Sequence, residues 1–314
     1  MNVVYVAGLG RSGSTLLSRL LGQMPGWVAV GELHNIWRSG ASRGRSDELC
    51  GCGRTFAECA FWRRVVASGL GGRSAAEASA LASRVARLRH LPWLAGPWRP
   101  SGFSRRLASY AAVMSELYRG AAAEGNGRVV VDSSKDLGPL WMLTRAPEVR
   151  VTVLHLVRDP RGVAFSWSKR LRRREFVDRE VLMPSWGALE TAWRWTYSNL
   201  LAEAAGRRHG RYLRLRYADL VRDPGGALAA IAHAVEPGEE QPPLPLVGDQ
   251  AVLTRENHTL AGNPMRFESG RLPIRADESW RRDLPRKARW TVSALTWPLL
   301  RRYGYSVRLV AEGR

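Results

Sequence analysis

The sequence is poor in acidic residues, lysine and cysteine, and it lacks any long uncharged apolar run. Its 314 residues include 28 Asp+Glu against 48 Lys+Arg, which gives a formal net charge of +20 at pH 7. No stretch approaches the roughly 18 apolar residues that a membrane span needs. The apolar segment Val3–Ala7 has neither a basic region before it nor a cleavage site after it. We therefore expect a cytoplasmic protein without a transmembrane segment.

The few cysteines exclude a disulfide scaffold. Cys50, Cys52 and Cys59 are an odd number within ten residues, a poor framework for a secreted fold. The spacing C-x-C-x₆-C, with His34 nearby, raises the question of zinc, but no fourth ligand stands at a standard spacing. We therefore expect no metal and interpret the segment as a structural turn with reduced or locally paired thiols.

Lysine is nearly absent, because 45 of the 48 basic residues are arginine. The lysines are Lys135, Lys169 and Lys287. Much of the positive charge is then generic surface arginine, whereas a remaining lysine is a candidate for a site where an ammonium matters. The charge predicts an anionic partner, which is nucleic acid, a membrane surface or a phosphorylated small molecule. Four arginines lie close together in the sequence, at Arg170, Arg172, Arg173 and Arg174. Because of this cluster, an acidic acceptor or a membrane surface stays an alternative binding partner.

What the sequence does contain is enough apolar content, 45%, for a sizeable core in one large domain. Buried strands are predicted at Val3–Ala7, Val129–Val131, Val151–Val157 and Tyr212–Tyr217. Long segments of helical composition separate these runs, which is typical of a parallel sheet with helices on both faces. The pattern predicts an α/β, three-layer fold with a central parallel sheet.

The longest interval, residues 35–128, is predicted to be a mainly helical insertion in a single domain spanning residues 1–314. Within it, Ala75–Leu91 and Arg105–Ala123 have helical composition, and Pro92–Gly102 resembles a connector. Near the C-terminus, Pro285–Tyr303 is predicted as a helix that begins with proline and is followed by Gly304.

A glycine-rich turn follows the first strand directly, in the sequence Gly8-Leu9-Gly10-Arg11-Ser12-Gly13-Ser14-Thr15. In a strand–turn–helix, backbone N–H groups and the positive helix end converge on a phosphate. The spacing matches the nucleotide loop G-x-x-x-x-G-K-S/T, except that Ser14 stands where the lysine would be. Because that lysine neutralises the β- and γ-phosphates of a triphosphate, its absence favours a donor with a single 5′-phosphate, although Arg11 can partly substitute.

A second anion site is predicted where the strand Val151–Val157 ends. Arg158 follows the strand, Pro160 can open the next helix, and Ser166 lies eight positions after Arg158, about two helical turns away. Arginine binds phosphate oxygens in a bidentate manner and a serine hydroxyl adds a donor. The alternative is a surface ion pair between Arg158 and Asp159 or another acid.

These two elements resemble the sulfotransferases that use 3′-phosphoadenosine 5′-phosphosulfate (PAPS). The segment Gly10–Leu16 is similar to their 5′-phosphosulfate-binding loop, so the resemblance implies that Gly10, Arg11, Ser12, Gly13, Ser14, Thr15 and Leu16 bind the cofactor. Arg158 and Ser166 match the pair that binds the 3′-phosphate. The resemblance implies a P-loop-like sulfotransferase fold and transfer of a sulfuryl group from PAPS to a hydroxyl or amine of a small molecule, glycan or lipid, with no metal and no nucleic-acid partner.

Two further segments resemble the same family. Arg216–Val221 is similar to an R-Y-E-D-L segment whose tyrosine, here Tyr217, approaches the nucleotide, although core packing is an alternative role for that ring. The loop His258–Phe267 is similar to one that closes over the adenosine diphosphate part in related bacterial enzymes. That similarity implies cofactor contacts from Gly262, Asn263 and Arg266, whereas a plain turn is the alternative.

The candidate general base is Glu32, which follows the apolar segment Trp27–Val30, interpreted as the next strand. A carboxylate just past a strand end can take a proton from an acceptor hydroxyl. The resemblance adds that a glutamate after glycine at this position is the catalytic base in several sulfotransferase families. His34 is the competing candidate, because other members of the family use a histidine in a different motif.

The candidate for stabilising the leaving group is Lys135, at the end of the strand that begins at Val129. An ammonium there can meet the departing phosphate as charge develops, and family enzymes with Lys-Asp after this strand use the lysine in that way. An opposing interpretation takes Asp132 as a magnesium ligand of a P-loop small-molecule kinase, against which Ser14 argues. The remaining alternative is a basic nucleic-acid-binding protein.

Overall fold

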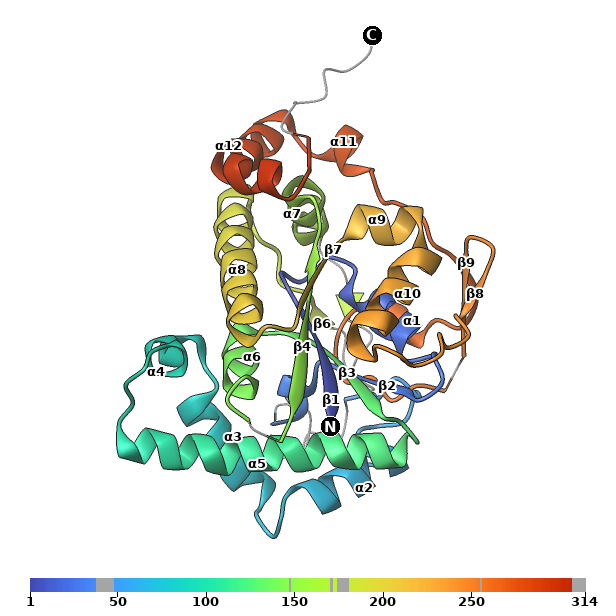
Figure 1. The fold of residues 1–314 in the computed structure, drawn as a ribbon. Helices are drawn as coiled ribbons and strands as arrows, with labels where there is room; N and C mark the ends of the chain where they lie inside the picture. Colours follow the sequence, from blue (N-terminus) through green and yellow to red (C-terminus); the bar gives the residue numbers. More distant parts are fainter. Residues whose placement is uncertain (38–47, 147, 170–171, 174–180, 255, 307–314) are drawn as a thin grey trace.

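The computed structural model describes residues 1–37, 48–146, 148–169, 172–173, 181–254 and 256–306. Its centre is a five-stranded, fully parallel sheet (Figure 1). In spatial order the strands are β2 (Trp27–Gly31), β3 (Val129–Lys135), β1 (Asn2–Ala7), β4 (Arg150–Val157) and β7 (Tyr212–Arg216). The predicted strands and the α/β class are confirmed.

Strand β1 shows why the sheet has two covered faces. Val3 and Tyr5 pack into one hydrophobic core, and Val4 and Val6 pack into another, because successive side chains of a strand point to opposite faces. A continuous apolar run is therefore what a strand buried on both sides needs.

Helices cover both faces of the sheet, as Figure 1 shows. One face is covered by α1 (Ser14–Leu21), α9 (Tyr217–Arg222) and α10 (Pro224–Val235). The other is covered by α5 (Ser101–Glu124), α6 (Leu137–Leu143) and α8 (Ala188–His209). Helices α2 (Ala60–Gly69) and α3 (Ala75–Val85) pack against α5. At one end of the sheet α7 (Pro160–Ser168) packs against α8 and α12 (Arg286–Arg302). No helix within these described residues is long and apolar enough to cross a membrane.

The remaining elements are short. They are η1 (Leu33–Trp37), η2 (Leu88–His90), α4 (Leu91–Ala95), β5 (Arg172–Arg173), β6 (Val181–Leu182), β8 (Leu246–Val247), β9 (Gln250–Leu253), η3 (Pro264–Phe267), β10 (Gly270–Pro273) and α11 (Trp280–Asp283). Strands β8, β9 and β10 form a small antiparallel sheet beside α1.

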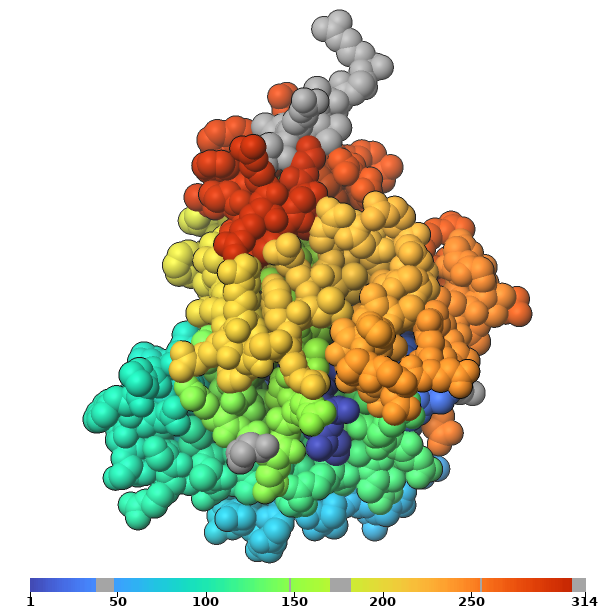
Figure 2. Space-filling view, in the orientation of Figure 1, coloured from blue at the N-terminus to red at the C-terminus, as the bar shows by residue number. Residues whose placement is uncertain are grey.

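The described residues 48–128 are mainly helical, but two helix boundaries predicted there are wrong. Helix α3 begins at a capping box made by Ser74 and Glu77, and it ends at Val85 rather than at Leu91. The predicted connector Pro92–Gly102 contains most of α4 and the start of α5. Proline is compatible with the first helical turn, where its missing N–H would have no intrahelical partner. In the space-filling view the insertion forms the cyan-to-green lower part of the molecule (Figure 2).

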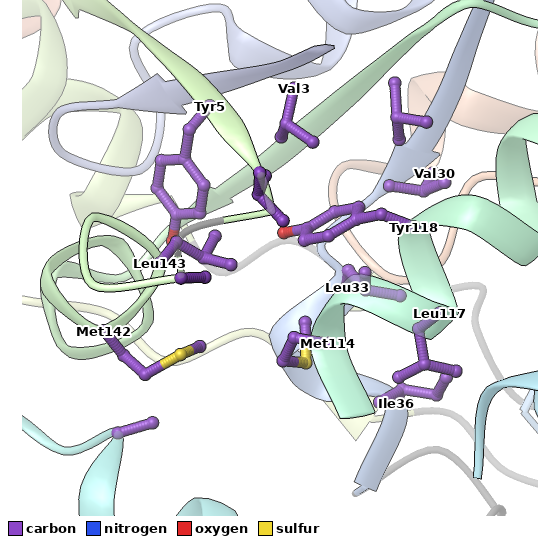
Figure 3. Close-up of a cluster of buried hydrophobic side chains, with 14 of the residues drawn as sticks. Val3, Tyr5, Val30, Leu33, Ile36, Met114, Leu117, Tyr118, Met142 and Leu143 are labelled. Atoms are coloured by element: carbon purple, nitrogen blue, oxygen red, sulfur yellow. The ribbon is translucent and has the colours of Figure 1, made fainter. Parts of the chain in front are cut away.

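The insertion and the sheet share one core. Figure 3 shows the rings of Tyr5 and Tyr118 among apolar side chains from the sheet and α5. The Tyr118 hydroxyl donates a 2.6 Å hydrogen bond to Asp132 Oδ2, and the Ser134 backbone N–H donates to Asp132 Oδ1 at 2.8 Å. Burial raises the pKa of Asp132. The buried side chain of Asp132 therefore connects α5 to the end of β3 through hydrogen bonds.

Candidate functional site

The predicted site residues come together because the sheet is parallel, so that all its strands end at the same edge. The residues there are the Gly8–Gly13 turn after β1, Glu32 after β2, Lys135 at the end of β3, Arg158 after β4 and Tyr217 after β7. A cavity of about 890 Å³ lies at this edge. Strand β1 is central, with later strands on both sides, and such a switch in strand order is where open α/β sheets bind ligands.

The glycine-rich turn has the backbone geometry of an anion cradle. Gly8, Arg11 and Gly13 all have positive φ angles, of 125°, 72° and 94°. A Cβ atom on Gly13 would lie 2.6 Å from the ring of Tyr217, so only glycine permits this close approach. Helix α1 begins at the next residue, Ser14, and has no acidic residue in its first turn. The turn and the helix start can therefore hold a phosphate without competition from a nearby carboxylate of that helix.

Most of the residues predicted to contact the cofactor line this cavity. They are Gly10, Arg11, Gly13, Ser14, Thr15, Leu16, Arg158, Ser166, Tyr217, Gly262 and Asn263. Ser12 is buried, 2% exposed, and is not among the lining residues.

Arg266, for which the resemblance implies a cofactor contact, is not among the residues that line the cavity. Its side chain is fully buried, and the guanidinium donates to the backbone carbonyls of Thr259, Ala261 and Leu49 at 2.8–3.2 Å. A guanidinium has five N–H donors, which suits it to gather several carbonyls at once. From behind the cavity wall, Arg266 thus fixes the backbone around Thr259 and Ala261.

Arg158 is anchored at the cavity by backbone and aromatic contacts. Its Nη1 donates to the Arg11 carbonyl at 3.0 Å, and its Nη2 lies 3.5 Å from Asp277 Oδ2. The guanidinium stacks over the Tyr217 ring, 4.7 Å from its centroid. Asp159, the ion-pair partner weighed from the sequence, instead binds Arg161 in a bidentate manner. The Arg158 side chain therefore contacts both the glycine-rich turn and Tyr217, and only 11% of it is exposed.

A stack of two tryptophan rings with an arginine at each end forms part of the cavity wall. The Trp167 and Trp186 rings lie 3.5 Å apart, with Arg11 over the first and Arg194 over the second. Trp167 Nε1 also donates a 3.1 Å hydrogen bond to the Gly10 carbonyl, which holds the glycine-rich turn in place. The sequence analysis missed Trp186 and Arg194, because neither belongs to a motif with a recognisable spacing.

Glu32 and Lys135 form a partly buried ion pair at the cavity. Lys135 Nζ lies 2.6 Å from Glu32 Oε1 and 2.6 Å from the Ser133 carbonyl oxygen, and Glu32 Oε2 accepts a hydrogen bond from Asn35 at 3.0 Å. The β1–β3 register shifts just before Lys135, which has a φ of 62°, an uncommon value for a residue other than glycine. Such local strain is often found at functional sites.

The electrostatic balance at Glu32 favours the ionised carboxylate. Burial alone would raise the pKa of Glu32, but the positive charge and hydrogen bond of Lys135, with contributions from His34 and Arg266, lower it overall. Glu32 is therefore a carboxylate at neutral pH. It can accept a proton at the same place where Lys135 can donate a hydrogen bond.

Residues 257–263, which we name the 257–263 loop, contact both Glu32 and the start of α1. The Glu32 backbone N–H donates to the Leu260 carbonyl at 2.7 Å. The position of a Cβ on Gly262 would be 3.5 Å from Thr15 Oγ1 and 3.6 Å from Glu32 Oε1. The Asn263 N–H donates to Thr15 Oγ1 at 3.4 Å. A shift of this loop would therefore move Glu32 and α1 together.

The competing candidates have different surroundings. His34 also lines the cavity, with its Nε2 4.0 Å from Asp136 Oδ2, so it stays an alternative base. Asp132 does not line it and is 1% exposed, with both carboxylate oxygens accepting hydrogen bonds from Tyr118 and Ser134. Asp132 therefore does not present its carboxylate to the cavity as a magnesium-binding residue of a kinase must.

The basic cluster weighed from the sequence cannot be placed. Arg170 and Arg174 lie outside the described residues, as do the side chains of Arg172 and Arg173.

Comparison with known proteins gives one family match. A model described as "Sulfotransferase family" matches residues 144–237, a segment that includes Arg158, Ser166 and Tyr217. The sulfotransferase domain from the Synechococcus PCC 7002 olefin synthase is 20% identical over 95% of this chain and 94% of that one, with a TM-score of 0.42. The sulfotransferase domain from the curacin biosynthetic pathway is 16% identical over 98% and 99%, with a TM-score of 0.49. No curated protein matches the sequence. The match over residues 144–237 confirms the sulfotransferase-family resemblance predicted from the sequence.

Proposed function

We propose that this sulfotransferase-family chain moves a sulfuryl group from PAPS to a hydroxyl or amine of a small-molecule, glycan or lipid acceptor. One observation carries the proposal. A single cavity is lined by the glycine-rich turn, in which Ser14 stands at the position of the P-loop lysine, by Arg158 and Ser166, and by the Glu32–Lys135 pair. A nucleotide with phosphates at both its 5′ and 3′ positions could use both the turn and the Arg158–Ser166 pair, whereas a nucleoside triphosphate would lack the lysine that its β- and γ-phosphates need.

The donor would be held by two elements. The Gly10–Leu16 turn and the start of α1 would hold the 5′-phosphosulfate with backbone N–H groups and hydroxyls. Arg158 and Ser166 would hold the 3′-phosphate. Tyr217 and the 257–263 loop, through Gly262 and Asn263, would enclose the nucleotide between them.

The chemistry is an in-line transfer. The acceptor oxygen or nitrogen forms a bond to sulfur while the bond from sulfur to the bridging phosphate oxygen breaks, and adenosine 3′,5′-bisphosphate leaves. Glu32 takes the acceptor proton. An ammonium has three N–H donors, and Lys135 gives two of them to Glu32 and the Ser133 carbonyl. The third would donate to the bridging oxygen as negative charge develops there.

The acceptor would occupy the part of the cavity that the donor elements do not form. That wall includes Asn35, Glu48 and Leu88 from the insertion, together with Leu137 and Tyr197. Its mixture of apolar and polar side chains suits a hydroxyl presented on a partly apolar body. In this proposal the insertion is the acceptor lobe of a single domain.

Ligand-dependent thermal stability tests the donor. We expect adenosine 3′,5′-bisphosphate to raise the melting temperature by several degrees when its concentration is about 100 times Kd, which corresponds to about 2.7 kcal/mol. ATP with Mg²⁺ at the same concentration is expected to have a much smaller effect. Stabilisation by ATP–Mg²⁺ alone would favour the kinase alternative, and tight duplex DNA binding that survives Arg11→Ala and Arg158→Ala would favour the nucleic-acid-binding alternative. Labelled sulfuryl transfer from PAPS to an acceptor panel then tests turnover.

Replacement of Arg158 tests the 3′-phosphate site. Arg158→Ala is expected to weaken adenosine 3′,5′-bisphosphate binding by about 10- to 100-fold, because a charge-assisted arginine–phosphate contact is lost. Binding of adenosine 5′-phosphosulfate, which lacks the 3′-phosphate, should change little. Isothermal titration of both ligands measures the difference.

The matched control for this change is Arg222→Ala, which removes the same charge from an exposed side chain paired with Asp219. An equal loss of affinity for both nucleotides in Arg158→Ala would contradict the 3′-phosphate role. It would assign Arg158 to supporting the Arg11 carbonyl instead.

A further inference from the structure

The three cysteines meet a fourth metal-binding side chain far away in the sequence. Cys50, Cys52 and Cys59 lie with His258 so that their sulfur atoms and a ring nitrogen are all within 4.8 Å of one another. Cys59 and His258 are separated by 199 residues in the chain. No fourth ligand stands at a standard spacing in the sequence, and the tertiary structure brings His258 to the thiols from outside that spacing.

Four of the six distances between these atoms are close to those around one tetrahedral ion. The Cys50–Cys59 and Cys52–Cys59 sulfur distances are 3.6 and 3.8 Å, and His258 Nδ1 lies 3.4 Å from Cys59 Sγ and 3.8 Å from Cys50 Sγ. A zinc ion with ordinary bond lengths and tetrahedral angles needs about 3.8 Å between two sulfurs and about 3.6 Å between sulfur and nitrogen. A disulfide needs about 2.05 Å between one chosen pair of sulfurs, whereas here Cys59 is almost equally close to both other thiols.

The local structure around the cysteines presents the thiols to one point. Residues 48–56, which we name the cysteine turn, fold back through a bridge between Leu49 and Thr55 and through a hydrogen bond from the Cys50 N–H to the Arg54 carbonyl. Cys59 precedes α2 at its N-cap and makes no side-chain capping bond. A thiolate is favoured at a helix N-terminus. The turn and the helix start thus supply the sulfur ligands from two adjacent elements.

His258 is held in place from two sides. Its ring stacks on Phe61 with centroids 4.6 Å apart and planes 5° apart, and its backbone carbonyl accepts a 2.9 Å hydrogen bond from Trp62 Nε1. The neighbouring chain is also fixed, because the Gly51 N–H donates to the Thr259 carbonyl at 3.0 Å. A Cβ on Gly51 would lie 1.9 Å from Asn257 Oδ1, so the cysteine turn and the 257–263 loop approach as closely as glycine allows.

We propose that Cys50, Cys52, Cys59 and His258 bind one zinc ion in a structural site. Thiolate and imidazole ligands select zinc over hard cations, and four protein ligands leave no open position for chemistry. Binding releases the thiol protons to solvent, so affinity falls at acidic pH. Cys52 is half-buried, and a second cavity of about 510 Å³ that reaches Cys52, Cys59 and His258 gives the ion a route in.

The bound ion would hold the 257–263 loop against the cysteine turn and the start of α2. His258 lies two residues before Leu260, whose carbonyl accepts the Glu32 N–H, and four residues before Gly262 at the cavity. Zinc binding would therefore stabilise the wall that contains Glu32 without touching any reacting atom. The site does not depend on which group the cavity transfers.

Metal analysis of the wild-type protein tests the proposal directly. Protein purified without a metal-affinity tag is expected to contain about one zinc ion per chain, as measured by inductively coupled plasma mass spectrometry. The three cysteines are the only ones in the chain, so they should resist a thiol reagent until a chelator removes the ion. Cobalt added to the chelated, reduced protein should give the charge-transfer and tetrahedral d–d bands of a cobalt–thiolate site, and the melting temperature should fall on chelation and recover with zinc.

Two variants and one control complete the test. Cys52→Ala and His258→Ala are expected to weaken zinc binding by about tenfold or more, whereas His233→Ala, at an exposed position on α10, should bind as the wild type does. Less than about 0.1 zinc per reduced chain at saturating zinc, or a cobalt spectrum without thiolate bands, would overturn the proposal. These wild-type measurements decide the matter even if a variant does not fold. Transfer activity is not the readout, so failure here is distinct from failure of the proposed reaction.

Discussion

Glu32→Ala is expected to lower kcat by about 10²- to 10⁴-fold, the usual contribution of a general base. The carboxylate is ionised, is 18% exposed and lies at the cavity in contact with Lys135. Affinity for adenosine 3′,5′-bisphosphate should change by no more than a few-fold, because the base acts mainly in the transition state. Labelled transfer assays and nucleotide titrations on the same preparations measure both quantities.

Glu32→Gln is the stricter version of this test. Glutamine keeps the size of the side chain and one of the two acceptor oxygens that Lys135 and Asn35 contact, but its amide cannot take a proton at neutral pH. We expect it to lose nearly as much activity as alanine does. His34→Ala should retain more activity than either variant. A larger loss in His34→Ala than in Glu32→Gln would assign the base to His34.

The pH dependence distinguishes the same two residues. A base acts in its deprotonated form, so a lowered pKa extends activity toward acidic pH. Because Lys135 lowers the pKa of Glu32, we expect kcat/KM to stay nearly constant between about pH 6 and 8 and to fall only below the ordinary carboxyl range of about 4.3. An inflection of kcat/KM between about pH 6 and 8 would contradict the assignment of the base to Glu32.

Lys135→Ala is the second change with a large expected effect, a loss of about 10²- to 10³-fold in kcat. Its ammonium would stabilise charge that develops on the bridging oxygen, and removal of one such preorganised donor has costs of this size. Nucleotide affinity should again change little by comparison. The matched control is Lys287→Ala, which removes an exposed ammonium on α12. Turnover by Lys135→Ala within about tenfold of the wild type would exclude the leaving-group role.

The two changes should not be additive. Removing Lys135 leaves the Glu32 carboxylate without its cation, which raises the pKa of Glu32 and alters the base as well. In a double-mutant cycle of Glu32→Gln and Lys135→Ala, we therefore expect the combined loss to be smaller than the product of the two separate losses. Independent losses would indicate that the ion pair is not kept during the reaction.

Sequence-based prediction worked best where the structure depends on local interactions. The apolar runs identified the strands because a strand buried on both faces needs a continuous apolar sequence. It failed at Val85, where α3 ends, because helix ends depend on tertiary packing as well as on local sequence. Asp277, which pairs with Arg158, carries no sequence signal, since it comes from a segment more than 100 residues away.

The sequence by itself determined the glycine-rich turn and the edge of the sheet on which the candidate site residues meet. Glycines at Gly8 and Gly13 permit the turn, and parallel strands bring Glu32, Lys135 and Arg158 to one edge whatever path their connections take. Only the tertiary structure decided that Arg266 lies behind the cavity and that His258 joins the cysteines. The physical reason is that both side chains depend on the path of the 257–263 loop beside β2, which is fixed by contacts between residues distant in the sequence.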